Sequence, residues 1–394
     1  MTKPRQWHPE TQLVHAGGLR SEFGETSEAL FLTQGFVYGS PEEAEARFDG
    51  SEPGFIYSRF SNPTVSMFEA RMCALEGAEA ARATASGMAA VTTALMGVVK
   101  AGDHVVAAQA LFGSCRWVIE EWLPRFGVAT TLVDGPDLAA WKAAIRPETK
   151  AFFLETPANP TLEVIDIIAV AALAKDCGAK LIVDNVFATP LFQKPLELGA
   201  DCVVYSATKH IDGQGRCLGG IILGSREFID THIHQVMRQT GPSISPFNAW
   251  VLLKGLETLS VRVARQTETA TTLARVIADH PKVLRVNFPG DPHHPQASII
   301  ARQMSGPSTL IAFEVKGDRA GAYRFLNALE IIKISNNLGD AKSLITHPAT
   351  TTHQRFSPDV RLAMGIPEGM VRLSCGLENA QDLAADLHAA LDHV

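Results

Sequence analysis

The sequence predicts an α/β protein built on a mainly parallel β-sheet, because short apolar runs alternate with helical patterns along most of the chain. Apolar strands separated by helices are typical of a parallel sheet that is covered on both faces. A second observation is that polar and ionisable residues directly follow several of the runs, as at the ligand-binding edge of such a sheet. The runs that we interpret as strands are residues 104–107, 151–154, 180–183, 202–205 and 220–223.

The helical segments between these runs follow the same scheme. Residues 166–177 have helical apolar spacing, and this helix is expected to end before Gly178, a residue type favoured just past helix C-termini. Residues 89–99 form another helical pattern. Beyond a long helical pattern over residues 246–279, further apolar runs predict a second, smaller α/β unit. The strands expected there are residues 283–286, 309–315, 331–334 and 371–374.

The length of 394 residues favours two domains, since single cores rarely grow that large. Residues 1–55 are rich in polar residues, glycine, proline and serine and show little periodicity, so we interpret them as an arm that lies over another surface. We expect a large domain over residues 56–255 and a C-terminal domain over residues 256–394.

Composition narrows the choice of partners and compartment. The formal net charge of −7 argues against a nucleic-acid or anionic-membrane partner, because both favour basic surfaces. No apolar run reaches the roughly 18 residues of a membrane span, and the start of the chain lacks the apolar core of a signal peptide. The six cysteines are scattered without metal-ligand spacing, and we expect them to be thiols in a reducing cytoplasm.

Several residues at strand ends could form one site. Asp184 follows one apolar run, and Ser206, Thr208 and Lys209 follow the next. Because helix N-termini bind anions through free N–H groups, the segment before the helical run 89–99 is suited to hold a phosphate. A phosphate cradle, a buried carboxylate and a reactive lysine on one rim would form a pyridoxal-phosphate site.

Each of these features also has an ordinary structural explanation. A lone Ser-x-Thr-Lys segment is usually a surface loop, an aspartate after a strand is more often a cap or turn residue, and Ser-Gly is a common helix start. Gly213 and Gly215 lack the spacing of a dinucleotide fingerprint, and His347 and His353 lack a partner at metal-ligand spacing. We expect no metal site, and the cofactor interpretation depends on the combination of features.

Six segments that span about residues 55 to 380 resemble the Cys/Met-metabolism family of fold-type I pyridoxal-phosphate enzymes. This family includes cystathionine synthases and lyases, methionine γ-lyase and homoserine-ester sulfhydrylases. The resemblance implies a fold-type I transferase fold, with a large mainly parallel mixed sheet domain that binds the cofactor and a smaller C-terminal α/β domain. It also implies a homo-oligomer, expected to be a tetramer built from dimers that share active sites, with the arm contacting a neighbouring subunit. The segments are residues 57–64, 85–90, 155–160, 183–189, 206–209 and 371–378.

The resemblance implies roles for individual residues at the cofactor. Lys209 would form the Schiff base and shuttle protons, Asp184 would pair with the pyridine nitrogen, and Asn159 would contact the ring hydroxyl group. The residues implied to hold the phosphate are Gly87, Met88, Ser206 and Thr208, together with Tyr57 and Arg59 of the neighbouring subunit.

The resemblance also implies how the substrate binds. Arg372 would bind the substrate α-carboxylate in a forked geometry that lysine could not match, assisted by backbone around Ser335. Tyr57 and Asn159 are expected to contact the substrate as well. Arg116 is our candidate for binding a distal succinyl carboxylate, the alternative being an arginine on a helix surface.

Phe112 departs from the family pattern, because many members carry at this position a tyrosine that stacks on the cofactor ring and takes part in proton transfer. Phenylalanine can stack but cannot donate a proton. Either the leaving group needs little protonation or another group supplies the proton. A carboxylate leaving group such as succinate is a weak base, so this residue favours an acylated homoserine over cystathionine.

Two further segments refine the expected reaction. Residues 336–349, which include Asp340 and Lys342, resemble the sulfhydrylases, and residues 210–216 resemble O-succinylhomoserine sulfhydrylases. We therefore expect a γ-replacement that converts O-succinyl-L-homoserine and hydrogen sulfide to L-homocysteine and succinate in methionine biosynthesis. An O-acetylhomoserine sulfhydrylase, a cystathionine γ-synthase, a methionine γ-lyase or a catalytically silent member stays open as an alternative.

Overall fold

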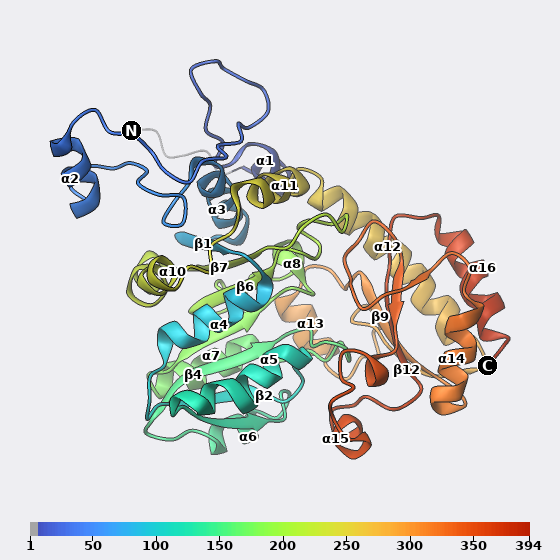
Figure 1. Cartoon of the computed structure of the whole chain (residues 1–394). Coiled ribbons are helices and arrows are strands. Elements are labelled where there is room, and N and C mark those ends of the chain that lie inside the picture. Colours follow the sequence, from blue (N-terminus) through green and yellow to red (C-terminus); the bar gives the residue numbers. More distant parts are fainter. Residues whose placement is uncertain (1–6) are drawn as a thin grey trace.

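The computed structural model describes residues 7–394, and these form two β-sheets with covering helices (Figure 1). The larger sheet has seven strands in the order β1-β7-β6-β5-β4-β2-β3. Strands β2 to β6 pair in parallel, whereas β7 pairs antiparallel with both β1 and β6, so the predicted mainly parallel mixed sheet is confirmed. The strands are β1 (Ala80–Thr84), β2 (His104–Ala108), β3 (Ala129–Val133), β4 (Thr149–Glu155), β5 (Lys180–Asp184), β6 (Cys202–Ser206) and β7 (Gly220–Gly224).

Two strands of this sheet, β1 and β3, were not predicted from the sequence. Strand β1 is rich in alanine, which is depleted in strands, and contains Arg82. Strand β3 lies at an edge of the sheet and is mostly half-buried or exposed, so it lacks a continuous apolar run. Both strands are therefore defined by their hydrogen-bonded neighbours more than by their own residues.

Helices cover both faces of the large sheet. Apolar residues of α4 and α7 form one core with the sheet, and those of α3 and α11 form a second core on the opposite face. The helices of this part are α3 (Pro63–Glu76), α4 (Gly87–Val98), α5 (Gly113–Trp117), α6 (Leu138–Ala143), α7 (Ile167–Asp176), α8 (Thr189–Phe192), α9 (Arg226–Phe228), α10 (His234–Thr240) and α11 (Pro246–Leu256), with π-helical turns at Val118–Trp122 and Ile229–Ile233 and a 3-10 turn at Leu123–Phe126.

Local capping sets the ends of the two helices that were predicted most clearly. The Asp166 carboxylate accepts a hydrogen bond from the Ala169 N–H at 3.2 Å at the start of α7, and Gly178 follows its end with a φ of 72°. Ser86 caps α4 in the same way, because its hydroxyl accepts from the Ala89 N–H at 3.1 Å. Strand ends and helix starts are thereby held at the same edge of the sheet.

The C-terminal part contains a five-stranded sheet in the order β10-β11-β12-β9-β8, in which only β10 and β11 pair in parallel. Strand β11 was not predicted, since it has only three residues. The strands are β8 (Val283–Asn287), β9 (Leu310–Val315), β10 (Lys333–Ile334), β11 (Leu344–Thr346) and β12 (Met370–Ser374). The helices are α12 (Leu259–Ala278), α13 (Ala297–Gln303), α14 (Asp318–Ala328), α15 (Pro358–Ala363) and α16 (Ala380–Leu391), with a 3-10 turn at Pro348–Thr350.

The long helical pattern over residues 246–279 corresponds to two helices, α11 and α12, rather than one. The break follows Gly255, whose carbonyl oxygen accepts a hydrogen bond from the Arg262 guanidinium at 2.8 Å. A Cβ atom at Gly255 would lie 2.4 Å from the Ile211 carbonyl oxygen, so the chain passes this point in close backbone contact. Tertiary contacts therefore end a helix that the periodicity would continue. The domain boundaries at residues 55 and 255 stay a prediction.

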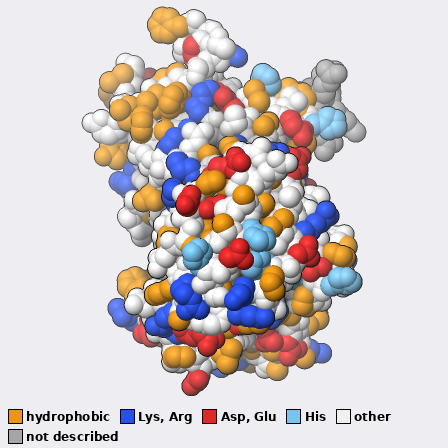
Figure 2. All heavy atoms as spheres, turned by 90° about the vertical axis from the view of Figure 1, so that its right-hand side faces the viewer, with side chains coloured by type: hydrophobic (Ala, Val, Ile, Leu, Met, Phe, Trp, Pro, Cys, Tyr) orange, Lys and Arg blue, Asp and Glu red, His pale blue; other side chains and the backbone are white. Residues whose placement is uncertain are grey.

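The N-terminal segment crosses the top of the molecule in Figure 1 and is only partly extended. It contains two short helices that were not predicted, α1 (Pro9–His15) and α2 (Pro41–Asp49), and Leu13 of α1 is buried against the core below α3. Other apolar side chains are exposed, including Phe23 at 85% and Val37 at 93%. Figure 2 shows hydrophobic side chains gathered at this end of the molecule, above a surface of mixed charges.

No helix of residues 7–394 is long and apolar enough to cross a membrane.

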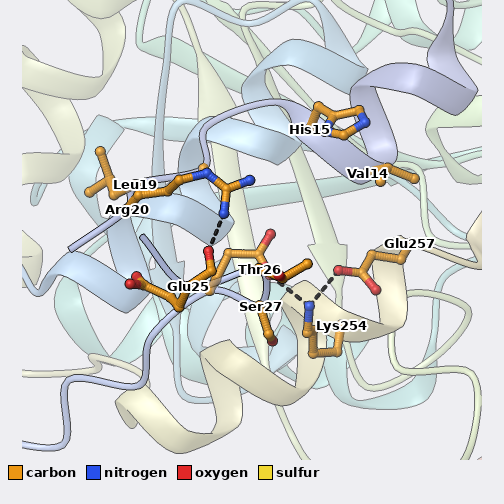
Figure 3. A pocket seen from close by; sticks show the side chains of 11 residues that line it. Val14, His15, Leu19, Arg20, Glu25, Thr26, Ser27, Lys254 and Glu257 are labelled. Carbon is orange, nitrogen blue, oxygen red and sulfur yellow. Dashed lines mark hydrogen bonds and ion pairs between the residues drawn. The ribbon is translucent and has the colours of Figure 1, made fainter. Parts of the chain in front are cut away.

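An ionic cluster holds this segment on α11. Glu28 pairs with the buried Arg71 of α3 and with Lys254 at 2.6 Å, and Lys254 also contacts Glu257 at 2.6 Å. Hydrogen bonds from Lys254 and Arg71 outweigh burial and lower the pKa of Glu28 to about 2. A cavity of about 440 Å³ lies beside this cluster, lined by residues 18–20, 25–28 and Lys254 among others (Figure 3).

Replacing the buried cation of this cluster is expected to destabilise the protein. Arg71→Met leaves Glu28 and the carbonyl oxygen of Ala16 without their guanidinium donor, which costs about 3 kcal/mol for a broken buried ion pair. The matched control Arg265→Met removes an exposed pair with Glu268 and is expected to cost less than about 1 kcal/mol. Denaturant unfolding measures both values, and equal losses would contradict the assignment. The stability due to Glu28 should be lost as the pH falls from about 4.5 toward 2.

Candidate active site

A pocket of about 220 Å³ lies at the carboxyl ends of β4, β5 and β6, where the sequence predicted one. It also receives residues from the start of α4, from the segment before α5 and from the loop after β10. The structure therefore brings together most of the predicted site residues. The lining residues are Ser86, Gly87, Met88, Val91, Phe112, Cys115, Glu155, Asn159, Asp184, Val186, Phe187, Ser206, Thr208, Lys209, Leu218, Asn336 and Leu338.

Lys209 is half-buried in the turn that follows β6, and its ammonium group donates a hydrogen bond to Asn337 Oδ1 at 2.6 Å. Burial, and then the positive charge of Arg372, lower the pKa of Lys209 to about 8. Both effects disfavour the charged ammonium form. The lowered pKa therefore raises the fraction of this lysine that is the neutral amine near neutral pH, which is the form that attacks carbonyl groups and accepts protons.

One end of the pocket has the donors of an anion site. The first N–H groups of a helix have no acceptor within the helix, and Gly87 and Met88 occupy these positions in α4. A Cβ atom at Gly87 would lie 2.7 Å from Ser206 Oγ, so only glycine lets the helix start approach β6 this closely. Thr208 Oγ1 accepts a hydrogen bond from the Gly219 N–H at 3.1 Å and lies on the same rim.

Asp184 ends β5 in the floor of the pocket, next to Glu155 in the β4–β5 register. Its Oδ1 accepts a hydrogen bond from the Val186 N–H at 3.1 Å. Burial is the dominant effect and raises the pKa of Asp184 to about 7. A buried carboxyl group of this kind binds a cationic partner well, because a positive charge would favour its ionised form.

Arg372 joins the second sheet to the pocket. It lies buried on β12, and its guanidinium donates to Asn159 Oδ1 at 2.6 Å and to the Asn336 carbonyl oxygen at 3.0 Å. The Phe187 ring lies 5.8 Å from the guanidinium carbon. Its Nε is buried without a hydrogen-bond partner among residues 7–394. Arg372 therefore keeps a donor for an anionic ligand.

Five predicted site residues are not among those that line this pocket within one chain: Arg372, which reaches it through Asn159 and Asn336, and Tyr57, Arg59, Ser335 and Arg116. Tyr57 and Arg59 are exposed on the N-terminal segment, where the Arg59 guanidinium contacts the Arg238 carbonyl oxygen and lies over the Phe60 ring. Ser335 directly precedes the lining residue Asn336, and its hydroxyl accepts a hydrogen bond from the Asn337 N–H at 3.3 Å. The predicted roles of these residues stay predictions.

Arg116 is buried rather than exposed on a helix surface, so the structural alternative stated for it is wrong. Its guanidinium donates to Glu120 Oε1 at 3.0 Å and to Met364 Sδ at 2.8 Å, and it lies over the Phe356 ring at 4.7 Å. Arg116 is not among the pocket-lining residues, and its charge is already paired. Its Nε is buried without a hydrogen-bond partner among residues 7–394, so Arg116 also keeps a donor.

Sequence reasoning gave neither Glu155 nor Asn337 a role in the site. Glu155 was recognised as a polar residue directly after an apolar run, in the segment 155–160, but no function was assigned to it. Asn337 lies in the loop after β10, far from Lys209 in the chain, and nothing in the sequence links the two. This contact depends on the packing of the small sheet against the large one.

Two groups of side chains outside the pocket, at His347 and at His280, contain histidines that could suggest a metal site. His347 uses both ring nitrogens, one with Thr350 Oγ1 at 2.8 Å and one with the Glu368 carbonyl oxygen at 2.7 Å. His280, His388 and Asp392 lie close enough to suggest a metal site. However, the Lys282 N–H donates to His280 Nδ1 at 3.3 Å, which leaves the ring proton on Nε2, facing Asp392. This contact favours a hydrogen-bonded pair over a ligand set.

The donors in the pocket fit pyridoxal phosphate. The free N–H groups of α4 and the rim hydroxyl groups suit a phosphate, Asp184 suits a protonated pyridine nitrogen, and the amine of Lys209 suits the aldehyde. The half-buried Phe112 ring lines the same pocket and is suited to stack on a flat ring system.

Comparison with known proteins agrees with this geometry. The family model for Cys/Met metabolism PLP-dependent enzymes matches residues 10–392. The chain is 53% identical to an O-succinylhomoserine sulfhydrylase of Mycobacterium tuberculosis, over 96% of this chain and 94% of that protein. It is 41% identical to an L-methionine γ-lyase of Porphyromonas gingivalis, over 97% of this chain and 96% of that protein.

The fold is also shared with solved structures. One is a Campylobacter jejuni protein described as an O-acetylhomoserine (thiol)-lyase, which carries an N'-pyridoxyl-lysine-5'-monophosphate; it aligns with a TM-score of 0.94 and 32% identity, over 98% of this chain and all of that chain. The full-length match and the pocket together show a pyridoxal-phosphate enzyme of fold-type I. The chain belongs to the Cys/Met metabolism PLP-dependent enzyme family.

Proposed function

We propose that this enzyme catalyses a γ-replacement in methionine biosynthesis, converting O-succinyl-L-homoserine and hydrogen sulfide to L-homocysteine and succinate. The Cγ–O bond of the ester breaks, a Cγ–S bond forms, and one proton of the sulfide is released with succinate. The observation that carries this proposal is the 53% identity over nearly the whole chain to a relative described as an O-succinylhomoserine sulfhydrylase.

Pyridoxal phosphate, when bound, supplies an aldehyde for amino groups and an electron sink for the carbon beside them. The protein supplies the base, which we assign to Lys209. Its lowered pKa lets the neutral amine take a proton from the substrate Cα and later from Cβ. Asp184 holds the cofactor nitrogen protonated, and the N–H groups of Gly87 and Met88 hold the phosphate.

Arg372 is assigned to the substrate α-carboxylate. The Nε of its buried guanidinium has no hydrogen-bond partner among residues 7–394, and the bond to Asn159 orients the guanidinium. Lysine could not replace it, because a single ammonium group lacks the planar pair of donors that a carboxylate binds. Backbone around Ser335 and the Asn159 side chain assist in this proposal.

Phe112 supports an ester substrate. A phenyl ring in the pocket can cover the cofactor ring but has no proton to give to a leaving group. Succinate leaves as a weakly basic carboxylate. A thiolate is a stronger base, so its departure depends more on protonation by an acid. The second candidate, a methionine γ-lyase that forms 2-oxobutanoate, is favoured by the 41% identity to the Porphyromonas gingivalis enzyme.

We also propose that the enzyme is a cytoplasmic homo-oligomer, a tetramer built from two dimers that share active sites. The exposed apolar side chains of the N-terminal segment, such as Phe23 and Val37, suggest a surface that a second copy covers. Tyr57 and Arg59 lie outside the pocket of their own chain, which supports their assignment to a neighbouring site. The six cysteines are all unpaired, as expected in a reducing compartment.

Addition of pyridoxal phosphate to the cofactor-free protein is expected to depend on pH with a midpoint near 8. The rate should rise as the pH increases through this value, since only the neutral amine of Lys209 reacts and its pKa is lowered to about 8. Stopped-flow absorbance measures this rate, with Lys175→Ala as an exposed-lysine control. A midpoint near the ordinary value of about 10 would refute the lowered pKa. Lys209→Ala should lose the covalent attachment altogether.

Steady-state kinetics separate the candidate reactions. With sulfide, the O-succinyl ester should give a kcat/KM at least about tenfold above that of the O-acetyl ester. The reason is that Arg116, the proposed cation, would bind the distal carboxylate that only the succinyl ester carries. Comparable values for both esters, together with no loss in Arg116→Ala, would exclude the succinyl assignment. Formation of 2-oxobutanoate that is undiminished by sulfide would instead support the γ-lyase.

The shared site is tested by mixing two inactive variants. Arg59→Ala and Lys209→Ala should each be inactive alone. Mixed dimers contain one site with both residues intact, so refolding the variants together should recover up to about a quarter of wild-type activity. Mixing Asp184→Ala with Lys209→Ala is the matched control, because both residues belong to the same chain's pocket in this proposal. Recovery in the control, or none in the test pair, would contradict a site shared in this way.

A further inference from the structure

Glu155 is the one acidic side chain of the pocket to which the mechanism gives no part. It is the last residue of β4, directly opposite Asp184 in the register of the large sheet, and it is almost fully buried. Its side chain lines the same cavity as Lys209. Burying a carboxyl group costs free energy unless hydrogen bonds compensate for the lost water, so the partners of Glu155 are informative.

The two oxygens of Glu155 have different backbone partners. Oε2 accepts a hydrogen bond from the Phe112 N–H at 2.7 Å, and Oε1 accepts from the Asn159 N–H at 3.1 Å. Phe112 lies just before α5 and brings its ring to the pocket, whereas Asn159 lies beyond the end of β4. A single carboxyl group therefore ties together two walls of the pocket that come from different loops.

The effect of this link extends to the second sheet. The Asn159 side chain accepts from the Arg372 guanidinium at 2.6 Å, so a shift of the Asn159 backbone would also move the partner of Arg372. On the other side, the Phe112 backbone sets where the aromatic ring stands. Glu155 is thus connected to both the ring that covers the cofactor position and the residue that orients the substrate arginine.

We propose that Glu155 is a positioning residue, which holds Phe112 and Asn159 in place through these two hydrogen bonds. The groups that face it are the Asp184 carboxyl group, whose charge opposes ionisation of Glu155, and the more weakly acting Arg372 guanidinium. Burial and Asp184 raise the pKa of Glu155 well above its usual range. A carboxyl group offers one acceptor oxygen to each of the two backbone N–H donors, those of Phe112 and Asn159. This positioning role does not depend on which ester the enzyme uses.

Glu155→Gln is the sharpest test, because the amide keeps the shape but has one oxygen. Its NH2 group would face one of the two backbone N–H donors, so one hydrogen bond must be lost. In the cofactor-free protein, hydrogen exchange should increase in residues 109–117 or 156–162 and remain unchanged in β2. In the loaded enzyme, kcat/KM should fall about 10- to 100-fold, as misplaced catalytic geometry does.

Glu155→Asp keeps both oxygens but is too short to reach both donors, so it should show the same local exchange and a similar loss. Glu163→Gln is the matched control: this glutamate is half-buried, has a pKa raised to about 7 by burial, and lies outside the pocket. It should leave exchange in both segments and kcat/KM unchanged.

Wild-type exchange and kcat/KM in Glu155→Gln would overturn the proposal. Global unfolding of both Glu155 variants, with Glu163→Gln folded, would also overturn it in favour of a role in folding. If the local exchange changes appear while no homoserine ester is converted by the wild-type enzyme either, Glu155 still positions these residues and the proposed reaction is wrong instead.

Discussion

The hydrogen bond between Arg372 and Asn159 is the contact on which the arrangement of the pocket depends. Arg372 belongs to β12 of the small sheet, and Asn159 follows β4 of the large sheet, so the bond joins the two parts of the molecule at the site itself. The same guanidinium lowers the pKa of Lys209. The contact between the two sheets therefore places Arg372 where its charge adds to the effect of burial on the pKa of Lys209.

The pocket concentrates ionisable groups whose pKa values are displaced in opposite directions. Burial lowers the pKa of Lys209 to about 8 and raises that of Asp184 to about 7, because low dielectric surroundings disfavour either charge. Displacements of this kind are frequent at catalytic sites. Here the pKa values of the Lys209 amine and of the Asp184 carboxyl group both lie near neutral pH, where each group can gain or lose a proton.

The features that define the family are distinct from those that choose the reaction. Lys209, Asp184 and Arg372 suit any amino-acid substrate of a pyridoxal-phosphate enzyme, and relatives with the names of a sulfhydrylase and of a γ-lyase match the chain over similar lengths. Choice among γ-reactions falls on residues around the leaving group. Of the two residues considered for this choice, Phe112 lines the pocket, whereas Arg116 pairs with Glu120 outside it.

Much of the fold could be predicted because buried parallel strands have a simple signature. Each of the five apolar runs from residue 104 to residue 223 lies within a strand, and Gly178 follows a helix as its φ preference requires. Strands β1 and β3 were not predicted, because alanine and half-exposed edge residues form strands only when neighbouring strands pair with them. The prediction of a single long helix over residues 246–279 was also wrong, because the chain is interrupted after Gly255, where it lies in close contact with the backbone of Ile211.

The sequence by itself determined the cofactor chemistry, since the lysine, aspartate and glycine-serine segments sit at strand ends that must converge on one edge of a parallel sheet. Only the tertiary structure decided which distant groups complete the site. Asn337 meets Lys209, and Glu155 meets Phe112, across separations that no local pattern encodes. The burial of Arg116 against Phe356 belongs to the same class. Such contacts arise from how two sheets and their loops pack, which is a property of the whole chain rather than of any segment.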